Sequence, residues 1–83
     1  MEKLLISLIV PALERRYDLF VPQDVPIRKV IEVMINGVRD LSDEQYQTSG
    51  REMLMSDRYD LPLREDQPLC AYGIRDGETL ILI

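Results

Sequence analysis

The residues that could do chemistry in this chain of 83 residues are few, and their types favour structural roles. Cys70 is the single cysteine, and the chain contains no histidine. A nucleophilic or redox-active thiol needs a neighbouring base or cation to lower its pKa, and the most common base is missing. Without imidazoles or a second thiolate, the usual ligand sets of zinc cannot form. We therefore expect no catalytic residue, no metal site and no cofactor.

Two acidic groupings could suggest a calcium site, but neither has the pattern of a calcium-binding loop. Asp76-Gly77 lacks the additional oxygen ligands that an EF-hand places at fixed spacing. Asp40, Asp43 and Glu44 follow a predicted helix, and a short acidic group at that place is typical of a solvated loop. Asp-Gly is also a common turn sequence, so a reverse turn explains the first grouping.

Composition and charge limit the class of partner. The chain carries 15 acidic and 10 basic side chains, which gives a net charge of −5. Nucleic acids and anionic membrane surfaces attract basic proteins, so we expect neither as a partner.

Residues 4–10 form a short apolar run, whereas a membrane span needs about 18 residues. A lone cysteine and the absence of a leader pattern favour a cytoplasmic protein.

The first half of the sequence predicts a hairpin followed by one helix. Residues 4–10 and 17–21 are rich in strand-forming side chains and are followed by Pro11 and Pro22. From Pro26 onward, apolar side chains recur at the spacing of one helix face. The positions are Ile27, Val30, Ile31, Met34, Ile35 and Val38. The helix either ends at Asn36-Gly37 or continues to Leu41.

The second half predicts shorter elements. Residues 52–56 are a third strand, and residues 61–63 are a very short fourth strand that Pro62 places at an edge of the sheet. Residues 69–72 are a single helical turn, and residues 79–83 are the last strand. The order is β-β-α-β-β-β in one domain, residues 1–83. This order predicts the α+β class, with a mixed sheet of four to five strands packed on one helix.

The C-terminal segment resembles the ubiquitin-like, or β-grasp, superfamily. The resemblance rests on Leu69, on Tyr72 three positions later, on Ile74 and on the strand Thr79-Leu80-Ile81-Leu82 after a tight turn. A narrower resemblance is to the small YukD and EsaB proteins of type VII (WXG100/ESX) secretion loci. That resemblance rests on the segment from Tyr17 to Pro22, on the segment from Pro26 to Lys29, and on Tyr72, Ile74, Asp76 and Gly77.

The resemblance implies a ubiquitin-like roll and a non-enzymatic role in protein interaction. The chain would be an accessory or regulatory component of a type VII secretion system, with secretion components as its partners. It also implies a structural role for Tyr72, buried and with its hydroxyl bonded to the backbone of the preceding loop. Two alternatives remain. One is a modifier or sulfur carrier, which the strand position of Ile83 and the missing Gly-Gly disfavour. The other is the N-terminal cytosolic domain of a larger membrane protein.

The strand pattern also predicts an apolar surface on the sheet. If residues 4, 6, 8 and 10 face the helix, the odd-numbered residues of that strand face outward. We applied the same alternation to the other strands, with Met53 and Met55 facing inward. The predicted outer surface consists of Leu5, Ile9, Phe20, Leu54, Ile81 and Ile83. A patch of this kind is typical of a protein-binding surface, and we also expect weak homodimerisation through it.

Overall fold

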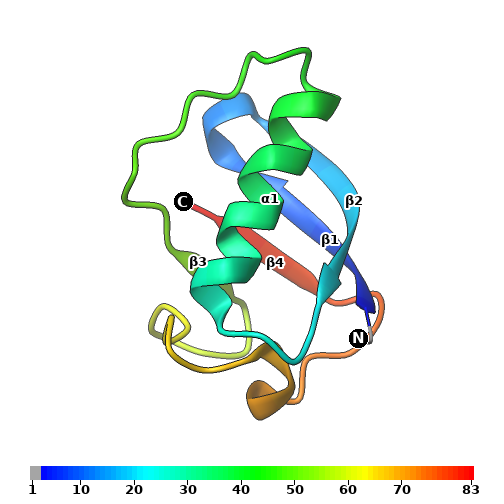
Figure 1. Ribbon diagram of the computed structural model, residues 1–83, viewed down its shortest axis with the longest axis vertical. Helices are drawn as coiled ribbons and strands as arrows, with labels where there is room; N and C mark the ends of the chain where they lie inside the picture. The colour runs from blue at the N-terminus through cyan, green and yellow to red at the C-terminus, as the bar shows by residue number, and fades with distance from the viewer. Residues whose placement is uncertain (1–2) are drawn as a thin grey trace.

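The computed structural model describes residues 3–83, and its four strands form one mixed sheet. The strands are β1 (Lys3–Val10), β2 (Arg15–Pro22), β3 (Leu54–Ser56) and β4 (Thr79–Leu82), and the single α-helix is α1 (Ile27–Leu41). The strand order is β2-β1-β4-β3 (Figure 1). β1 and β4 pair in parallel at the centre, and the two outer pairs are antiparallel. The predicted α+β class with a helix on a mixed sheet is therefore confirmed.

The β1–β2 hairpin turns through a 3₁₀ helix at Pro11–Leu13. Glu14 follows in the left-handed conformation, with φ of 53°, and its N–H donates to the carbonyl of Pro11 at 3.0 Å. This compact turn sets the register of the hairpin, which runs from the Val10–Arg15 pair to the Lys3–Pro22 pair. β2 is therefore longer than the predicted segment 17–21.

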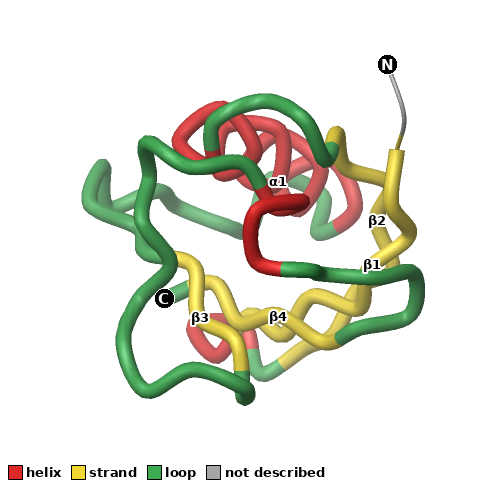
Figure 2. Tube along the Cα trace, turned by 90° about the horizontal axis from the view of Figure 1, so that it is seen from below, coloured by secondary structure: helices red, strands yellow, loops and turns green. Residues whose placement is uncertain are grey.

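Helix α1 covers one face of the sheet, as Figures 1 and 2 show. Pro26 precedes it with φ of −56°, and the carbonyl of Pro26 accepts hydrogen bonds from the N–H groups of Lys29 and Val30. Five of the six predicted core positions are buried, and Ile35 packs against the core partly buried. The buried residues are Ile27, Val30, Ile31, Met34 and Val38. The 3.6-residue period therefore identified the buried face of the helix correctly.

The helix continues to Leu41, so the alternative stop at Asn36-Gly37 is wrong. Gly37 lies directly against β2, and a Cβ atom at this position would lie 3.4 Å from Cδ2 of Leu19. Helix α1 and β2 therefore approach each other closely at this point, with room for a methyl group but not for a larger side chain. Asn-Gly is a common helix stop, but here Gly37 lies inside α1, on the flank that packs against β2.

The sheet contributes the rest of the core. Its inward side chains come from all four strands, and residues from the segments between the elements complete it. The sheet residues are Leu4, Ile6, Leu8, Val10, Val21, Leu54, Leu80 and Leu82, and the others are Tyr46, Leu63, Leu69 and Ile74. The predicted inward phase of the first and last strands is confirmed, because Leu8 and Leu80 are fully buried.

The predicted fourth strand at residues 61–63 is absent from the sheet. Leu63 makes one backbone hydrogen bond, from its N–H to the carbonyl of Leu54 at 2.9 Å, and Leu61 is 74% exposed. Pro62 has no N–H, so the segment cannot extend this single contact into a ladder. The sheet therefore has four strands.

Tyr72 ends the predicted helical turn, which the structure shows as a 3₁₀ helix at Leu69–Tyr72. Its hydroxyl accepts a hydrogen bond from the N–H of Arg64 at 2.8 Å, as the resemblance implied. Its carbonyl accepts from Arg58 and from the hydroxyl of Tyr59, both at 3.0 Å. The Tyr72 ring is half-buried rather than buried, because it packs edge-to-face on the partly exposed Tyr59.

Candidate partner-binding surface

The sheet face opposite α1, called here the outer face, carries the apolar side chains that the helix does not cover. Its largest apolar group crosses three strands. Ile9 of β1 lies beside Ile81 of β4, and Ile81 lies beside Met55 of β3. Beyond this row, Met53 and Ile83 exchange two backbone hydrogen bonds at 2.8 and 2.9 Å. We call these five residues the outer patch.

A second, smaller apolar group lies across β1 and β2. Leu5 and Phe20 are direct cross-strand partners, and Phe20 is 65% exposed. A polar row separates this pair from the outer patch. The row consists of Asp18, Ser7 and Thr79, which are paired across β2, β1 and β4. The predicted single patch is therefore divided into two groups.

The assignment of Leu54 to the outer face is wrong. Leu54 is fully buried beneath α1, while Met53 is 43% exposed and Met55 is partly exposed. The prediction placed Met53 and Met55 inward, and this choice reversed the phase of the strand. A one-residue error in strand phase moves every side chain to the opposite face. The correct phase replaces Leu54 with Met53 and Met55.

A buried carboxylate explains this phase. Glu52 points inward and is only 6% exposed. Its Oε2 accepts hydrogen bonds from the Tyr46 hydroxyl at 2.8 Å, the Thr48 hydroxyl at 2.5 Å and the Ser49 N–H at 3.1 Å. Burial alone would raise the pKa of Glu52, but the bonds from Thr48, Tyr46 and Ser49 outweigh it and hold the pKa below its ordinary value. The carboxylate thereby fixes the loop before β3.

The same network affects Tyr46. Burial, together with the hydrogen bond to Glu52 and the charge of that carboxylate, raises the pKa of the Tyr46 phenol above its ordinary value. Tyr46 therefore stays neutral and acts as a donor. Glu52 and Ser56, both buried, alternate with the two methionines in the sequence. This alternation is the only sequence signal for the phase of β3. It predicts the correct phase only if Glu52 is assumed to be buried with hydrogen-bond donors around its carboxylate.

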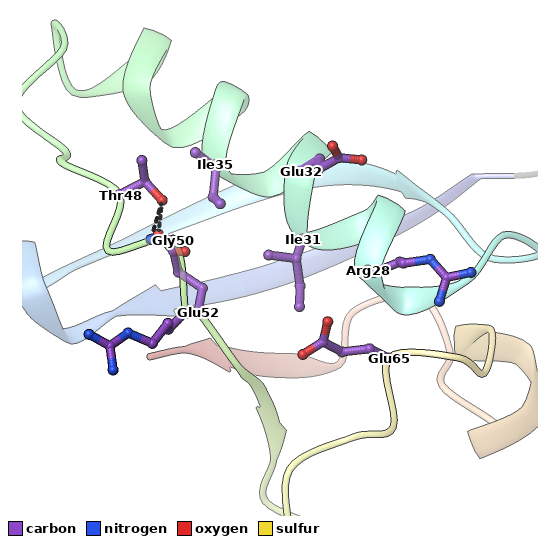
Figure 3. A pocket seen from close by; sticks show the side chains of 9 residues that line it. Arg28, Ile31, Glu32, Ile35, Thr48, Gly50, Glu52 and Glu65 are labelled. Atoms are coloured by element: carbon purple, nitrogen blue, oxygen red, sulfur yellow. Dashed lines mark hydrogen bonds between the residues drawn. The ribbon is translucent and has the colours of Figure 1, made fainter.

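An open hollow of about 440 Å³ lies between α1 and residues 48–52 (Figure 3). Ile31 and Ile35 project into it from the helix, and Glu65 and Arg28 lie at one end. Arg51 comes from the opposite wall. The hollow contains no thiol or amine, and the carboxylate of Glu52 is already occupied by its three donors, the hydroxyls of Tyr46 and Thr48 and the N–H of Ser49.

The other chemical candidates remain apart from one another. Cys70 is an exposed free thiol on the 3₁₀ helix at Leu69–Tyr72. Asp76 bonds to the backbone of Leu5, and Asp43 and Glu44 lie in a turn with positive φ of 54° and 63°. Within residues 3–83, no group of three or more potential ligands could hold a metal ion. No helix in the same range is long and apolar enough to cross a membrane.

Known structures with this fold include domains of secretion proteins. The ubiquitin-like domain of ECCD1, a type VII secretion system protein of Mycobacterium tuberculosis, superimposes with a TM-score of 0.78 at 21% identity, covering 100% of this chain and 99% of that one. The ubiquitin-like domain of EccD5 from Mycobacterium xenopi gives 0.70 at 19% identity, covering 100% and 94%. A chain of the MycP5-free ESX-5 inner membrane complex gives 0.71 at 17% identity, and the match covers 21% of that chain.

The sequence itself carries the family assignment. The family model described as "WXG100 protein secretion system (Wss), protein YukD" matches residues 5–82. No curated protein matches the chain. Because the family model spans almost the whole sequence, the chain belongs to the YukD family of the WXG100 secretion system, and its fold is ubiquitin-like.

Proposed function

We propose that this protein is a non-enzymatic docking module of a type VII secretion machine and acts as an accessory or regulatory component. It binds another protein of the machine, at the cytosolic side of the membrane, through the outer patch. The observation that carries the proposal is the continuous apolar row from Ile9 through Ile81 to Met55, extended by Met53 and Ile83. A solvated antiparallel face would normally alternate with polar side chains here.

The outer patch has the physical properties of a protein-binding surface. Three of its five residues stand on strands, and Met53 and Ile83 are held beside them by their two backbone hydrogen bonds, so little backbone entropy is lost when a partner binds. Methionine is flexible and polarisable and adapts to an irregular partner surface. Burial of apolar area contributes about 25 cal/mol per Å². A partner with an exposed apolar face would therefore be held without any charged contact at the centre.

The comparisons support a partner within the secretion machine. The fold occurs in a chain of the ESX-5 inner membrane complex, of which it occupies 21%, and in a chain of an ESX-3 core complex, of which it occupies 16%. Both chains are parts of larger complexes, and the ESX-5 complex is an inner membrane complex. By analogy, we place the partner of this chain among the proteins encoded by its own secretion locus.

Ile81→Arg tests the proposal against Thr79→Arg as a matched control. Thr79 is two residues away on the same strand and the same face, but it belongs to the polar row. We expect Ile81→Arg to weaken binding to an individually purified secretion component at least tenfold, and Thr79→Arg to leave it within threefold. Calorimetric titration measures the affinity. In a strain lacking the wild-type gene, only Thr79→Arg should restore export of WXG100 proteins.

Equal binding by both variants would show that the partner uses another surface. Loss of binding in both, with unchanged circular dichroism, would show that the whole face is recognised and that the outer patch has no special role. Export restored by Ile81→Arg would contradict a docking role of the patch in the cell.

A further inference from the structure

The two edges of the sheet differ in how they are protected. β3 is three residues long, and the carbonyl of Leu54 on that strand is already bonded to Leu63. β2 is eight residues long and forms the opposite edge (Figure 1). Long unpaired edges are templates for pairing with another strand, and native proteins usually cover or interrupt them. The exposed edge of β2 therefore needs an explanation.

The hydrogen-bond pattern identifies which backbone groups of β2 are free. Leu5 accepts from the N–H of Gly77 at 2.7 Å, and the N–H of Ser7 donates to Glu78 at 2.9 Å, so the odd-numbered residues of β1 point toward β4. The even-numbered residues of β1 must then bond to β2. Their partners in the register are the odd-numbered residues of β2. The N–H and carbonyl groups of Arg16, Asp18 and Phe20 consequently point away from the sheet.

We propose that two copies of this chain pair antiparallel through β2, with Arg16 of each copy opposite Asp18 of the other. Both side chains lie on the outer face and both are exposed. In an antiparallel ladder both residues of a hydrogen-bonded pair must offer outward backbone groups, so only Arg16, Asp18 and Phe20 can form such pairs with one another. Directly opposed side chains have Cβ atoms about 5 Å apart, within reach of an ion pair.

Charge selects this register among those that the backbone permits. In the register centred on Asp18, the Asp18 carboxylates of the two copies would lie opposite each other. In the register centred on Arg16, the two Arg16 guanidinium groups would lie opposite each other. Like charges directly opposed destabilise a strand pair. The register that opposes Asp18 to Phe20 forms no ion pair. The register centred on Tyr17 is the one that creates two symmetric Arg16–Asp18 pairs.

The helix side of the same edge is apolar. Val33, Gly37 and Leu41 are spaced four residues apart and so lie on one flank of α1. Gly37 contacts Leu19, so this flank overlooks β2. Val33 is 42% exposed and Leu41 is 55% exposed. A two-fold axis perpendicular to the sheet would bring the two α1 flanks toward each other and remove these side chains from water.

The paired copies would form one continuous sheet of eight strands. Both helices would lie on one side and both outer patches on the other, because a two-fold axis perpendicular to the sheet preserves its faces. Dimerisation through β2 therefore leaves the outer patch free and presents it twice. It differs from self-association through the outer face, and it stands independently of the proposed docking function.

A charge-swap experiment tests the pairing, with the dimer dissociation constant measured by analytical ultracentrifugation. Arg16→Asp would oppose two acids and Asp18→Arg two bases, so each variant should raise the constant about tenfold or more. An equimolar mixture of the two variants opposes acid to base at both positions and should restore dimerisation at wild-type affinity. Native mass spectrometry then identifies the species as a heterodimer.

Two matched controls separate this register from overall charge. Arg15→Asp makes the same charge change next to Arg16 but on the other face, and Asp24→Arg lies beyond β2; both should dimerise as the wild type does. Asp18→Arg reduces the net charge from −5 to −3, because one acid is replaced by one base. A general charge effect would therefore strengthen that dimer, whereas the proposed register weakens it.

Three results would overturn the proposal. The first is a wild type that remains monomeric up to about 1 mM. The second is unchanged dimerisation of both single variants. The third is loss of self-association in Ile81→Arg, which would move the contact to the outer patch. Arg16 and Asp18 are exposed, so circular dichroism should show that every variant is folded.

Discussion

The carboxylate of Asp76 accepts a hydrogen bond from the N–H of Leu5 at 2.9 Å, although the two residues are 71 positions apart. The next residue, Gly77, donates its N–H to the carbonyl of Leu5 at 2.7 Å. The turn before β4 thus holds both backbone groups of one residue of β1. Gly77 adopts φ of 86°, a conformation that side chains disfavour, so the Asp-Gly sequence suits both contacts.

Asp76→Ala should lower the free energy of unfolding by about 1–2 kcal/mol, because it leaves the N–H of Leu5 without its acceptor. Asp76→Asn keeps a carbonyl oxygen at the same place and should recover about half of the loss. Urea denaturation measures both. Asp57→Ala, on an exposed turn, is the control and should stay within about 0.5 kcal/mol of the wild type. Equal stability of Asp76→Ala and Asp57→Ala would show that the long-range bond contributes nothing.

Adjacent residues of β4 should respond oppositely to a charge. Leu82 is 2% exposed and lies beneath α1, so Leu82→Arg should abolish folding or cost several kcal/mol. Ile81 lies on the outer face, so Ile81→Arg should change the unfolding free energy by less than about 0.5 kcal/mol. Thermal unfolding followed by circular dichroism distinguishes the two. A folded Leu82→Arg would refute the described phase of β4.

Glu52 should make stability depend on pH in the acidic range. Its folded pKa lies below the ordinary value, so the folded protein binds this proton less tightly than the unfolded chain does. The resulting stabilisation is fully present above about pH 4.3, the ordinary pKa of glutamate, and is lost as the pH falls through the folded value. Glu52→Gln should be less stable at pH 7 and show a flatter pH profile below pH 4.3. Urea midpoints of the wild type and Glu52→Gln between pH 2.5 and 7 provide the measurement. Parallel pH profiles of the two proteins would contradict a stabilising role of the ionised Glu52.

Gly37→Ala should stabilise the protein by about 0.5–1 kcal/mol. Alanine is a better helix former than glycine, and its methyl group would lie at ordinary contact distance, 3.4 Å, from the flexible Leu19 side chain. Gly37→Leu needs more room than the gap between α1 and β2 offers and should destabilise by about 1–3 kcal/mol. Chemical denaturation of both variants tests the spacing. Stabilisation by Gly37→Leu would show that the helix does not press on β2.

The sequence predicted the elements with a strong period and missed those held by distant contacts. Helix α1 was predicted well because its apolar spacing is regular over three turns. β1 and β4 were placed correctly because alternation and composition agree there. The phase of β3 was wrong because Glu52 is buried, and its donors lie in a loop with no periodic pattern. The hydrogen bond of Asp76 to Leu5 could not be predicted from the local sequence either.

For the candidate surface too, the features that depend on local alternation were predicted and those that depend on distant contacts were not. Leu5, Ile9, Phe20, Ile81 and Ile83 were placed on the outer face by alternation, and the structure agrees for each. Leu54 was misplaced together with the phase of β3. The separation into two groups depends on register, which sets Ser7 beside Thr79 and Asp18. The register is set by the hairpin turn between β1 and β2 and by the long connection to the parallel strand β4. It therefore cannot be predicted from the residue types of the strands alone.

The parallel pairing of β1 with β4 also governs when this protein can fold. β1 ends at residue 10 and β4 begins at residue 79, so the central pair of the sheet cannot form until β4 has been made. At about 5–20 residues per second, the ribosome needs roughly 3–14 s to synthesise the segment between them. During that interval a β1–β2 hairpin has two open edges, and its apolar face has only α1 to cover it. Folding of the sheet must therefore wait for β4, and contacts so distant in sequence make it slower than in helical proteins of this size.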